Sequence, residues 1–179
     1  GYDQYRGVAF GLHASGYLTK PILPEDVRWE LEDLRRPVQL PVTKRIRVQT
    51  FGNFEVFLDG LPIRFKYERT KEMLAYLVDR AGAYCTNGEL LGILFENEPG
   101  HEAYLKKLRQ DLLETFSRSG CGQVIVHQRG KLAVDPAQVD CDYYDWRDGK
   151  SQAVNLYRGE YMSQYSWAEF KHSSLQSLK

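Results

Sequence analysis

Apolar and polar side chains alternate along residues 46–51 and again along residues 54–58, which is the two-residue period of half-buried β-strands. Asp59-Gly60 then separates the second run from a third at residues 61–65. This dipeptide is typical of two-residue hairpins, because both central positions of a type I′ turn need positive φ. Pro62 favours a sheet edge, since proline cannot donate a ladder hydrogen bond. The pattern predicts a small antiparallel meander.

From residue 70 the period becomes helical. A stripe of apolar side chains predicts a helix over residues 70–81, with Gly82 as its stop. The stripe consists of Met73, Leu74, Leu77, Val78 and Ala81. Thr86 and Glu89 have the spacing of a capping box, in which each side chain bonds the other residue's backbone N–H. They predict the start of a short second helix that continues to Leu94.

A third helix is predicted over residues 101–116, after a loop at residues 96–100. Its faces differ: Leu105, Leu108, Leu112 and Phe116 form the apolar face, and Glu102, Ala103, Lys106, Lys107 and Gln110 the polar one. Apolar runs at residues 124–126 and 132–134 then flank the turn dipeptide Arg129-Gly130. They predict a β-hairpin.

Pro37 and Pro41 disfavour helix and mark a linker at residues 37–45. The linker separates residues 1–36 from the unit of meander, helices and hairpin at residues 46–135. The remaining residues, 136–179, are rich in aromatic side chains, and we expect them to form a helical C-terminal extension.

The chain of 179 residues has 24 Lys and Arg side chains against 24 Asp and Glu, and 42% of its residues are hydrophobic. This composition is typical of a folded globular protein. Zero net charge argues against a nucleic-acid-binding protein, which usually has a basic surplus. Residues 101–131, however, hold six basic side chains against three acidic ones, a local surplus of three. The alternative interpretation of this surplus is an ordinary solvated helix face.

Motifs of enzymes are missing: the sequence has no Gly-rich phosphate loop, no H-E-x-x-H and no G-x-S-x-G. Its four histidines are isolated from one another: His13, His101, His127 and His172. Asp140, Cys141 and Asp142 are adjacent, but no histidine or second cysteine lies nearby, which disfavours a metal site. We therefore predict that the protein is not an enzyme and has no catalytic residue, metal or cofactor.

Three widely spaced cysteines fit free thiols in a reducing compartment better than a disulfide framework. No apolar run reaches the length of a membrane span, and the N-terminus lacks the layout of a signal peptide. We expect a cytoplasmic protein without a membrane partner.

The order of three helices and a hairpin after a meander resembles the winged-helix effector domain of OmpR/PhoB-type response regulators. It is also similar to the DNA-binding domain of the streptomycete antibiotic regulatory proteins. Three stretches carry the resemblance: residues 51–54 with Asp59-Gly60, the recognition-helix-like residues 104–112, and the basic wing tip at residues 127–130. One departure is Lys131, where family members often have an aromatic residue soon after the wing glycine. The resemblance implies an α+β fold, a winged helix-turn-helix with an N-terminal β-meander and a C-terminal wing.

The same resemblance implies seven candidate DNA contacts: Tyr104, Lys106, Lys107, Arg109, Gln110, Arg129 and Lys131. The two helix lysines suit phosphates, and Gln110 can read adenine with two hydrogen bonds. Arg109 is either a DNA contact or a structural ion pair with a neighbouring acid. Arg129 is either a minor-groove probe or an exposed wing arginine. Tyr76 and Tyr84 are interpreted as packing residues.

Residues 1–36 resemble the C-terminal part of a receiver domain, an α-β-α segment. The match consists of Tyr17, Lys20 and Pro21, and residues 5–13 and 24–34 resemble the fourth and fifth receiver helices. The resemblance implies Tyr17 as the switch aromatic and Lys20 as the partner of a phosphoryl oxygen. The alternatives are a half-buried strand residue and a surface lysine. A receiver's phosphoacceptor and metal pocket lie on earlier strands, so we expect this chain to accept no phosphoryl group itself and to dimerise through this segment.

Residues 139–146 and 156–169, with the run LYRGE, resemble the opening of the transcriptional activator domain of the antibiotic regulatory proteins. Together the resemblances predict a transcriptional regulator that is the output portion of a two-component phosphorelay response regulator. It would bind double-stranded DNA sequence-specifically as a homodimer and contact RNA polymerase through residues 94–100. A sensor histidine kinase would act on the full-length parent. The alternative function is a winged-helix protein-interaction module that does not bind DNA.

Overall fold

The computed structural model describes residues 22–25, 27, 44–150, 157–169, 171 and 175. The chain divides into two compact units, Gly1–Thr43 and Lys44–Lys179. In the first unit Pro24, Glu25 and Val27 are helical, within the helix predicted over residues 24–34. The predicted receiver residues Tyr17 and Lys20 lie outside the described residues.

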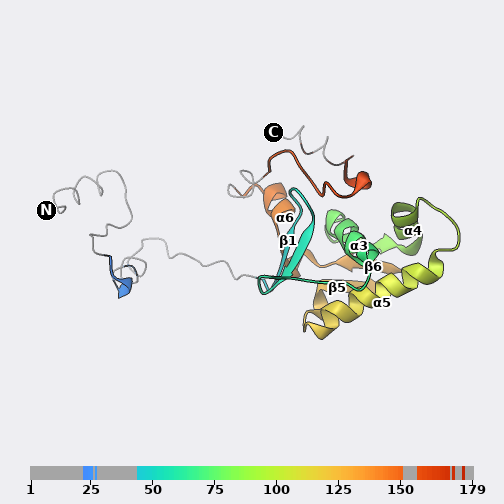
Figure 1. Ribbon diagram of the computed structural model, residues 1–179, viewed down its shortest axis with the longest axis horizontal. Coiled ribbons are helices and arrows are strands. Elements are labelled where there is room, and N and C mark those ends of the chain that lie inside the picture. The colour runs from blue at the N-terminus through green and yellow to red at the C-terminus, as the bar shows by residue number, and fades with distance from the viewer. Residues whose placement is uncertain are drawn as a thin grey trace. The chain divides into compact units, whose positions relative to one another are not determined.

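The second unit begins with the predicted meander (Figure 1). Strand β1 (Ile46–Gln49) pairs antiparallel with β2 (Glu55–Leu58), and β2 pairs antiparallel with β3 (Leu61–Pro62). Asp59 and Gly60 between β2 and β3 have φ values of 48° and 85°, so both turn positions are left-handed as the hairpin prediction required.

The third strand is shorter than the predicted run at residues 61–65. It pairs only at Leu61 and Pro62, and the Ile63 N–H adds one further bond of 2.8 Å to the Val56 carbonyl. The chain then leaves the sheet, and the backbone N–H groups of Lys66 and Tyr67 donate to the carboxylate of Asp111.

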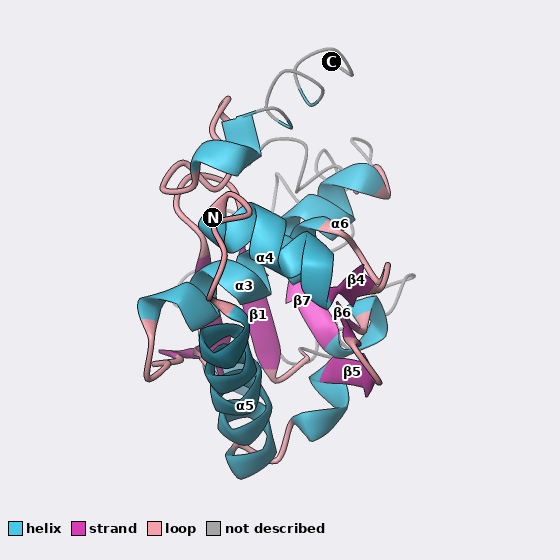
Figure 2. Ribbon diagram, turned by 90° about the vertical axis from the view of Figure 1, so that its right-hand side faces the viewer, coloured by secondary structure: helices cyan, strands magenta, loops and turns pink. Residues whose placement is uncertain are grey.

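Three helices follow: α3 (Glu68–Asp79), α4 (Asn87–Phe95) and α5 (Glu102–Arg118). They agree with the three predicted helices in order and position. Between and after them a second sheet forms, with strand order β4-β6-β5, from β4 (Cys85–Thr86), β5 (Ile125–Gln128) and β6 (Lys131–Val134) (Figure 2). Strands β5 and β6 are the predicted hairpin, with Gln128 opposite Lys131 across the turn.

Two local predictions at the helices were wrong in part. The Thr86 hydroxyl does accept a bond of 3.2 Å from the Glu89 N–H, as a capping box requires. The Glu89 carboxylate, however, accepts from the Tyr76 hydroxyl at 2.8 Å and pairs with Arg80, so the reciprocal half of the box does not form. Ala81 lies beyond the end of α3, with φ of 48°, because the helix already stops at Asp79.

The C-terminal segment, expected to be helical, instead begins with a strand. After a short 3-10 turn (Pro136–Gln138), β7 (Val139–Cys141) pairs parallel with β1 and completes a four-stranded sheet of order β3-β2-β1-β7. Helix α6 (Asp142–Arg147) follows, then a 3-10 turn (Ser166–Ala168), and the described residues Glu169, Lys171 and Leu175 are helical, in agreement with part of the expected helical extension. Parallel pairing needs a long crossover, which residues 50–138 provide.

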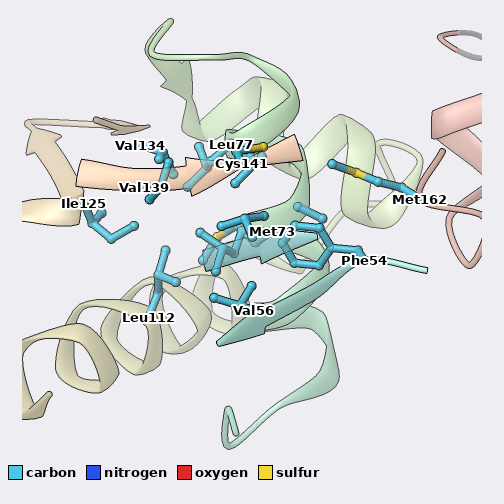
Figure 3. Close-up of a cluster of buried hydrophobic side chains, with 14 of the residues drawn as sticks. Phe54, Val56, Met73, Leu77, Leu112, Ile125, Val134, Val139, Cys141 and Met162 are labelled. Atoms are coloured by element: carbon cyan, nitrogen blue, oxygen red, sulfur yellow. The ribbon is translucent and has the colours of Figure 1, made fainter. Parts of the chain in front are cut away.

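Apolar side chains of both sheets and of α3 and α5 form the hydrophobic core (Figure 3). Val56 of β2, Met73 of α3 and Leu112 of α5 are fully buried within it, and Val139 of β7 is 2% exposed. Cys85, Cys121 and Cys141 are buried and free, in agreement with the sequence. Among the described residues, no helix combines the length and apolar character needed to cross a membrane.

Candidate nucleic-acid interface

Helix α5 has a solvent-exposed face that carries three of the predicted contacts, Lys106, Lys107 and Gln110. Neither lysine has an ion pair with another described residue. The side-chain amide of Gln110 donates a hydrogen bond of 2.7 Å to the Glu114 carboxylate one turn further along. The two ammonium groups and an amide are therefore accessible on a rigid element.

Arg109 lies at the edge of this face, half-buried. Its guanidinium donates a hydrogen bond to the side-chain oxygen of Asn87, the first residue of α4. Burial lowers the pKa of Arg109. The predicted alternative for this residue, an ion pair with an acid, was wrong in the nature of the partner, which is a neutral amide.

The backbone of Asn87 makes a second contact, to the hairpin. Its N–H donates a bond of 3.0 Å to the carbonyl of Gly130 in the β5–β6 turn. Immediately before it, Cys85 and Thr86 of β4 pair with Leu132 and Lys131 of β6. The start of α4 therefore connects α5 on one side with the hairpin on the other (Figure 2).

The hairpin is the wing of the predicted fold, and its tip is exposed. Arg129 and Lys131 flank Gly130, whose φ of 74° suits a glycine in the turn. Tyr84, interpreted as a core residue, is instead 38% exposed, and its hydroxyl accepts a bond of 3.1 Å from the Gln128 side chain. The reason is that Tyr84 precedes β4 at the surface of the wing sheet.

Tyr104, another predicted DNA contact, is half-buried among aromatic rings. It packs edge-on against Tyr67 with ring centroids 5.8 Å apart, and lies at the same centroid distance from Phe95. Its ring thus stabilises the contact between α5, α4 and the start of α3. Tyr76, interpreted as a packing residue, is partly buried against the core and packs edge-on against Trp167, as predicted.

Between α4 and α5 lies a hollow of about 260 Å³. Its apolar wall is formed by Leu91 and Leu105. Its polar rim consists of Asn87, Glu102, Lys106 and Arg109. The hollow therefore opens beside the exposed lysine face of α5.

The sequence did not indicate that Asn87 belongs to this surface. It follows the capping residue Thr86, and a polar residue at that position is unremarkable in a helix start. Its two contacts, with Arg109 and Gly130, span 22 and 43 positions in sequence. Contacts between residues so far apart leave no pattern in the local sequence.

The loop between α4 and α5 is exposed at residues 96–100, whereas Leu94 and Phe95, also predicted to contact a polymerase, are buried. Glu96 and Asn97 have φ values of 52° and 63°. Two consecutive left-handed residues without glycine turn the chain sharply at the end of α4. The His101 ring then stacks on Phe95 with centroids 4.3 Å apart.

Comparison with models of protein families finds no match, and neither does comparison with curated proteins. Among solved structures, Mycobacterium tuberculosis EmbR in complex with a low-affinity phosphopeptide is similar, with a TM-score of 0.60 and 17% sequence identity. The similarity covers 75% of this chain and 42% of EmbR, so this chain matches less than half of that protein's length. At this identity the likeness shows the fold alone: an α+β, winged-helix-like fold that this chain shares with part of EmbR.

Proposed function

We propose that the winged-helix unit binds double-stranded DNA sequence-specifically and that the protein is a transcriptional regulator. One observation carries the proposal. The exposed basic face of α5 and the basic tip of the wing are joined through Asn87, which contacts Arg109 and Gly130. A helix and a wing that act on one DNA duplex must be held in a fixed relation.

The dimensions and chemistry of α5 suit the major groove. A helix with its side chains is about 10–12 Å across, and the major groove is about 12 Å wide. Lys106 and Lys107 would neutralise phosphates, whereas Gln110 would exchange its bond with Glu114 for a base edge. Arg129 at the wing tip would enter the adjacent minor groove.

The position of one acidic side chain of α5, Asp111, supports the same surface. Asp111, one of the three acids of residues 101–131, is only 6% exposed and receives hydrogen bonds from Lys66, Tyr67 and Thr70. It points into the molecule, so it faces no DNA on the exposed side of α5. With zero net charge overall, the protein should bind non-specific DNA weakly at physiological salt.

The remaining partners rest on the resemblance of the sequence. We propose that the receiver-like residues 1–36, with Tyr17 and Lys20, belong to a two-component response regulator that acts in the cytoplasm and binds as a homodimer. A sensor histidine kinase would control the full-length parent. The exposed residues 96–100 are the proposed contact with RNA polymerase.

Selection of binding sites from random duplex DNA with the purified chain tests the proposed function. We expect a common motif to be enriched, with a dissociation constant at least about 1,000-fold lower than for a scrambled duplex. Enrichment of no motif, together with salt-independent or undetectable binding, would contradict DNA recognition. That result would favour the alternative of a protein-interaction module.

A further inference from the structure

We propose that Asn87 is a positioning residue for DNA recognition, which holds the Arg109 guanidinium in its reading orientation and fixes the wing relative to α5. The inference rests on the proposed function and deepens it. It assigns a specificity role to a residue of α4 that lies outside the predicted recognition helix and wing.

The direction of the Asn87–Arg109 bond is set by chemistry. A guanidinium carries five N–H donors and no acceptor, so the atom of Asn87 that faces it must be the amide oxygen. One edge of the planar guanidinium is thereby occupied, and its remaining donors keep a fixed orientation. Arginine reads guanine through two parallel donors, and that geometry depends on the orientation of the plane.

The surroundings of Arg109 agree with a held rather than a mobile side chain. Arg109 is half-buried and, together with Asn87 and Lys106, lines the hollow between α4 and α5. When an arginine becomes ordered only on binding, its loss of rotamer freedom lowers the affinity of the protein for DNA. A hydrogen bond present in the free protein removes part of that cost in advance.

Asn87 is not required as a helix cap, which separates this role from an ordinary structural one. The capping bond at the start of α4 is made by the Thr86 hydroxyl with the Glu89 N–H. The Asn87 side chain is therefore free of the capping function and is directed to Arg109. Its backbone N–H, which any residue except proline would supply, makes the contact with the wing carbonyl of Gly130.

Asn87 contacts Arg109 through its side chain and the wing through its backbone. Substitution of the Asn87 side chain should therefore release Arg109 and leave the wing contact in place. The experiment compares Asn87→Ala, Arg109→Lys and the double variant Asn87→Ala/Arg109→Lys with the unsubstituted full chain. Lysine retains the charge of residue 109 and lacks the planar fork. Asn53→Ala, an exposed asparagine on the loop between β1 and β2, is the matched control. Thermal unfolding of each variant identifies any that does not fold.

Binding is measured to the selected duplex and to a scrambled duplex of the same length. We expect each single variant to lose about five- to tenfold in affinity for the selected duplex and less than about twofold for the scrambled one. The double variant should lose no more than the single variants, because both changes remove one interaction. The control should bind like the unsubstituted chain.

Three results would overturn the inference. Asn87→Ala could keep its preference for the selected duplex, or the losses of the two single variants could add in the double variant. Asn87→Ala could also weaken both duplexes equally. These outcomes differ from failure of the proposed function, in which the unsubstituted chain itself would not distinguish the two duplexes.

Discussion

The hydroxyl of Thr70, at the start of α3, donates a hydrogen bond of 2.6 Å to the carboxylate of Asp111 in the middle of α5. Thr70 is fully buried and Asp111 nearly so. The same carboxylate accepts from the backbone N–H groups of Lys66 and Tyr67, which precede the helix. One acid of α5 therefore holds the beginning of α3 against α5.

Asp111→Ala should lower the free energy of unfolding by about 3 kcal/mol. The change leaves two backbone N–H groups and the Thr70 hydroxyl without their buried acceptor. Urea unfolding followed by circular dichroism measures it. Glu114→Ala, which removes an exposed acid from the same helix, is the control and should change the unfolding free energy by less than about 0.5 kcal/mol. Equal stability of the two variants would contradict the role of Asp111 in holding the start of α3.

Asp142→Ala should destabilise the fold by about 2–3 kcal/mol. The Asp142 carboxylate accepts from the N–H and the hydroxyl of Thr50, at 2.8 Å and 2.6 Å, and from the N–H of Phe51 at 3.0 Å. It thus joins the end of β1 to the start of α6. Asp148→Ala, an exposed acid that follows α6, serves as the control in the same unfolding experiment. An unchanged midpoint for Asp142→Ala would show that the hydrogen bonds of the Asp142 carboxylate add no stability to the fold.

The unfolding free energy should change little between pH 8 and about pH 9 and then fall as the pH rises further. Burial raises the pKa of the Cys85 thiol from its ordinary value of 9.0 to about 11. Burial, with Asp79 nearby, also raises the pKa of Tyr161 well above its ordinary value of 10.0. Above these ordinary values the unfolded chain loses protons that the folded chain retains, so unfolding becomes more favourable.

Urea titrations at pH 8, 9.5 and 10.5 measure this loss of stability. Tyr161→Phe loses the hydroxyl that donates to Asp79 at 2.8 Å and is expected to be less stable at pH 8. It should, however, show a shallower decline above pH 10, because phenylalanine does not ionise. A decline as steep as that of the unsubstituted chain would contradict the part assigned to Tyr161.

Arg129→Ala should weaken binding to the selected duplex about five- to tenfold without a change in thermal stability. The side chain is exposed at the wing turn, so its removal leaves the packing intact. Equilibrium fluorescence anisotropy measures the affinity, and Arg147→Ala, an exposed arginine of α6 outside the wing, is the control for charge. Unchanged affinity would identify Arg129 as an ordinary solvated residue.

The sequence predicted the elements whose signals are local. Asp59-Gly60 indicated its turn, and apolar spacing indicated α3 and α5. It did not predict the pairing of β7 with β1, because partners 93 positions apart, such as Ile46 and Val139, leave no periodic trace. Polar contacts were missed for the same reason. Asp111 looks like an ordinary surface acid of an amphipathic helix, and only the packed structure brings it to Thr70.

For the candidate site, the exposed positions of Lys106 and Lys107 followed from helix periodicity and agree with the structure. The partner of Arg109 did not follow from it. Periodicity identifies the face on which a side chain lies, but the residue opposite it depends on how two helices cross. Whether any of these side chains contacts DNA stays a prediction.

If the exposed face of α5 binds DNA phosphates, as proposed, the affinity for DNA must depend on salt through the lysines of that face. The logarithm of the affinity for the selected duplex is measured against the logarithm of salt concentration for the unsubstituted chain, Lys106→Ala and Lys107→Ala. The control is Lys150→Ala, which removes a lysine that follows α6 and pairs with Asp145 of that helix. We predict that each α5 variant reduces the slope by about one and that the control leaves it unchanged. Equal slopes for all four proteins would contradict phosphate binding by this face of α5.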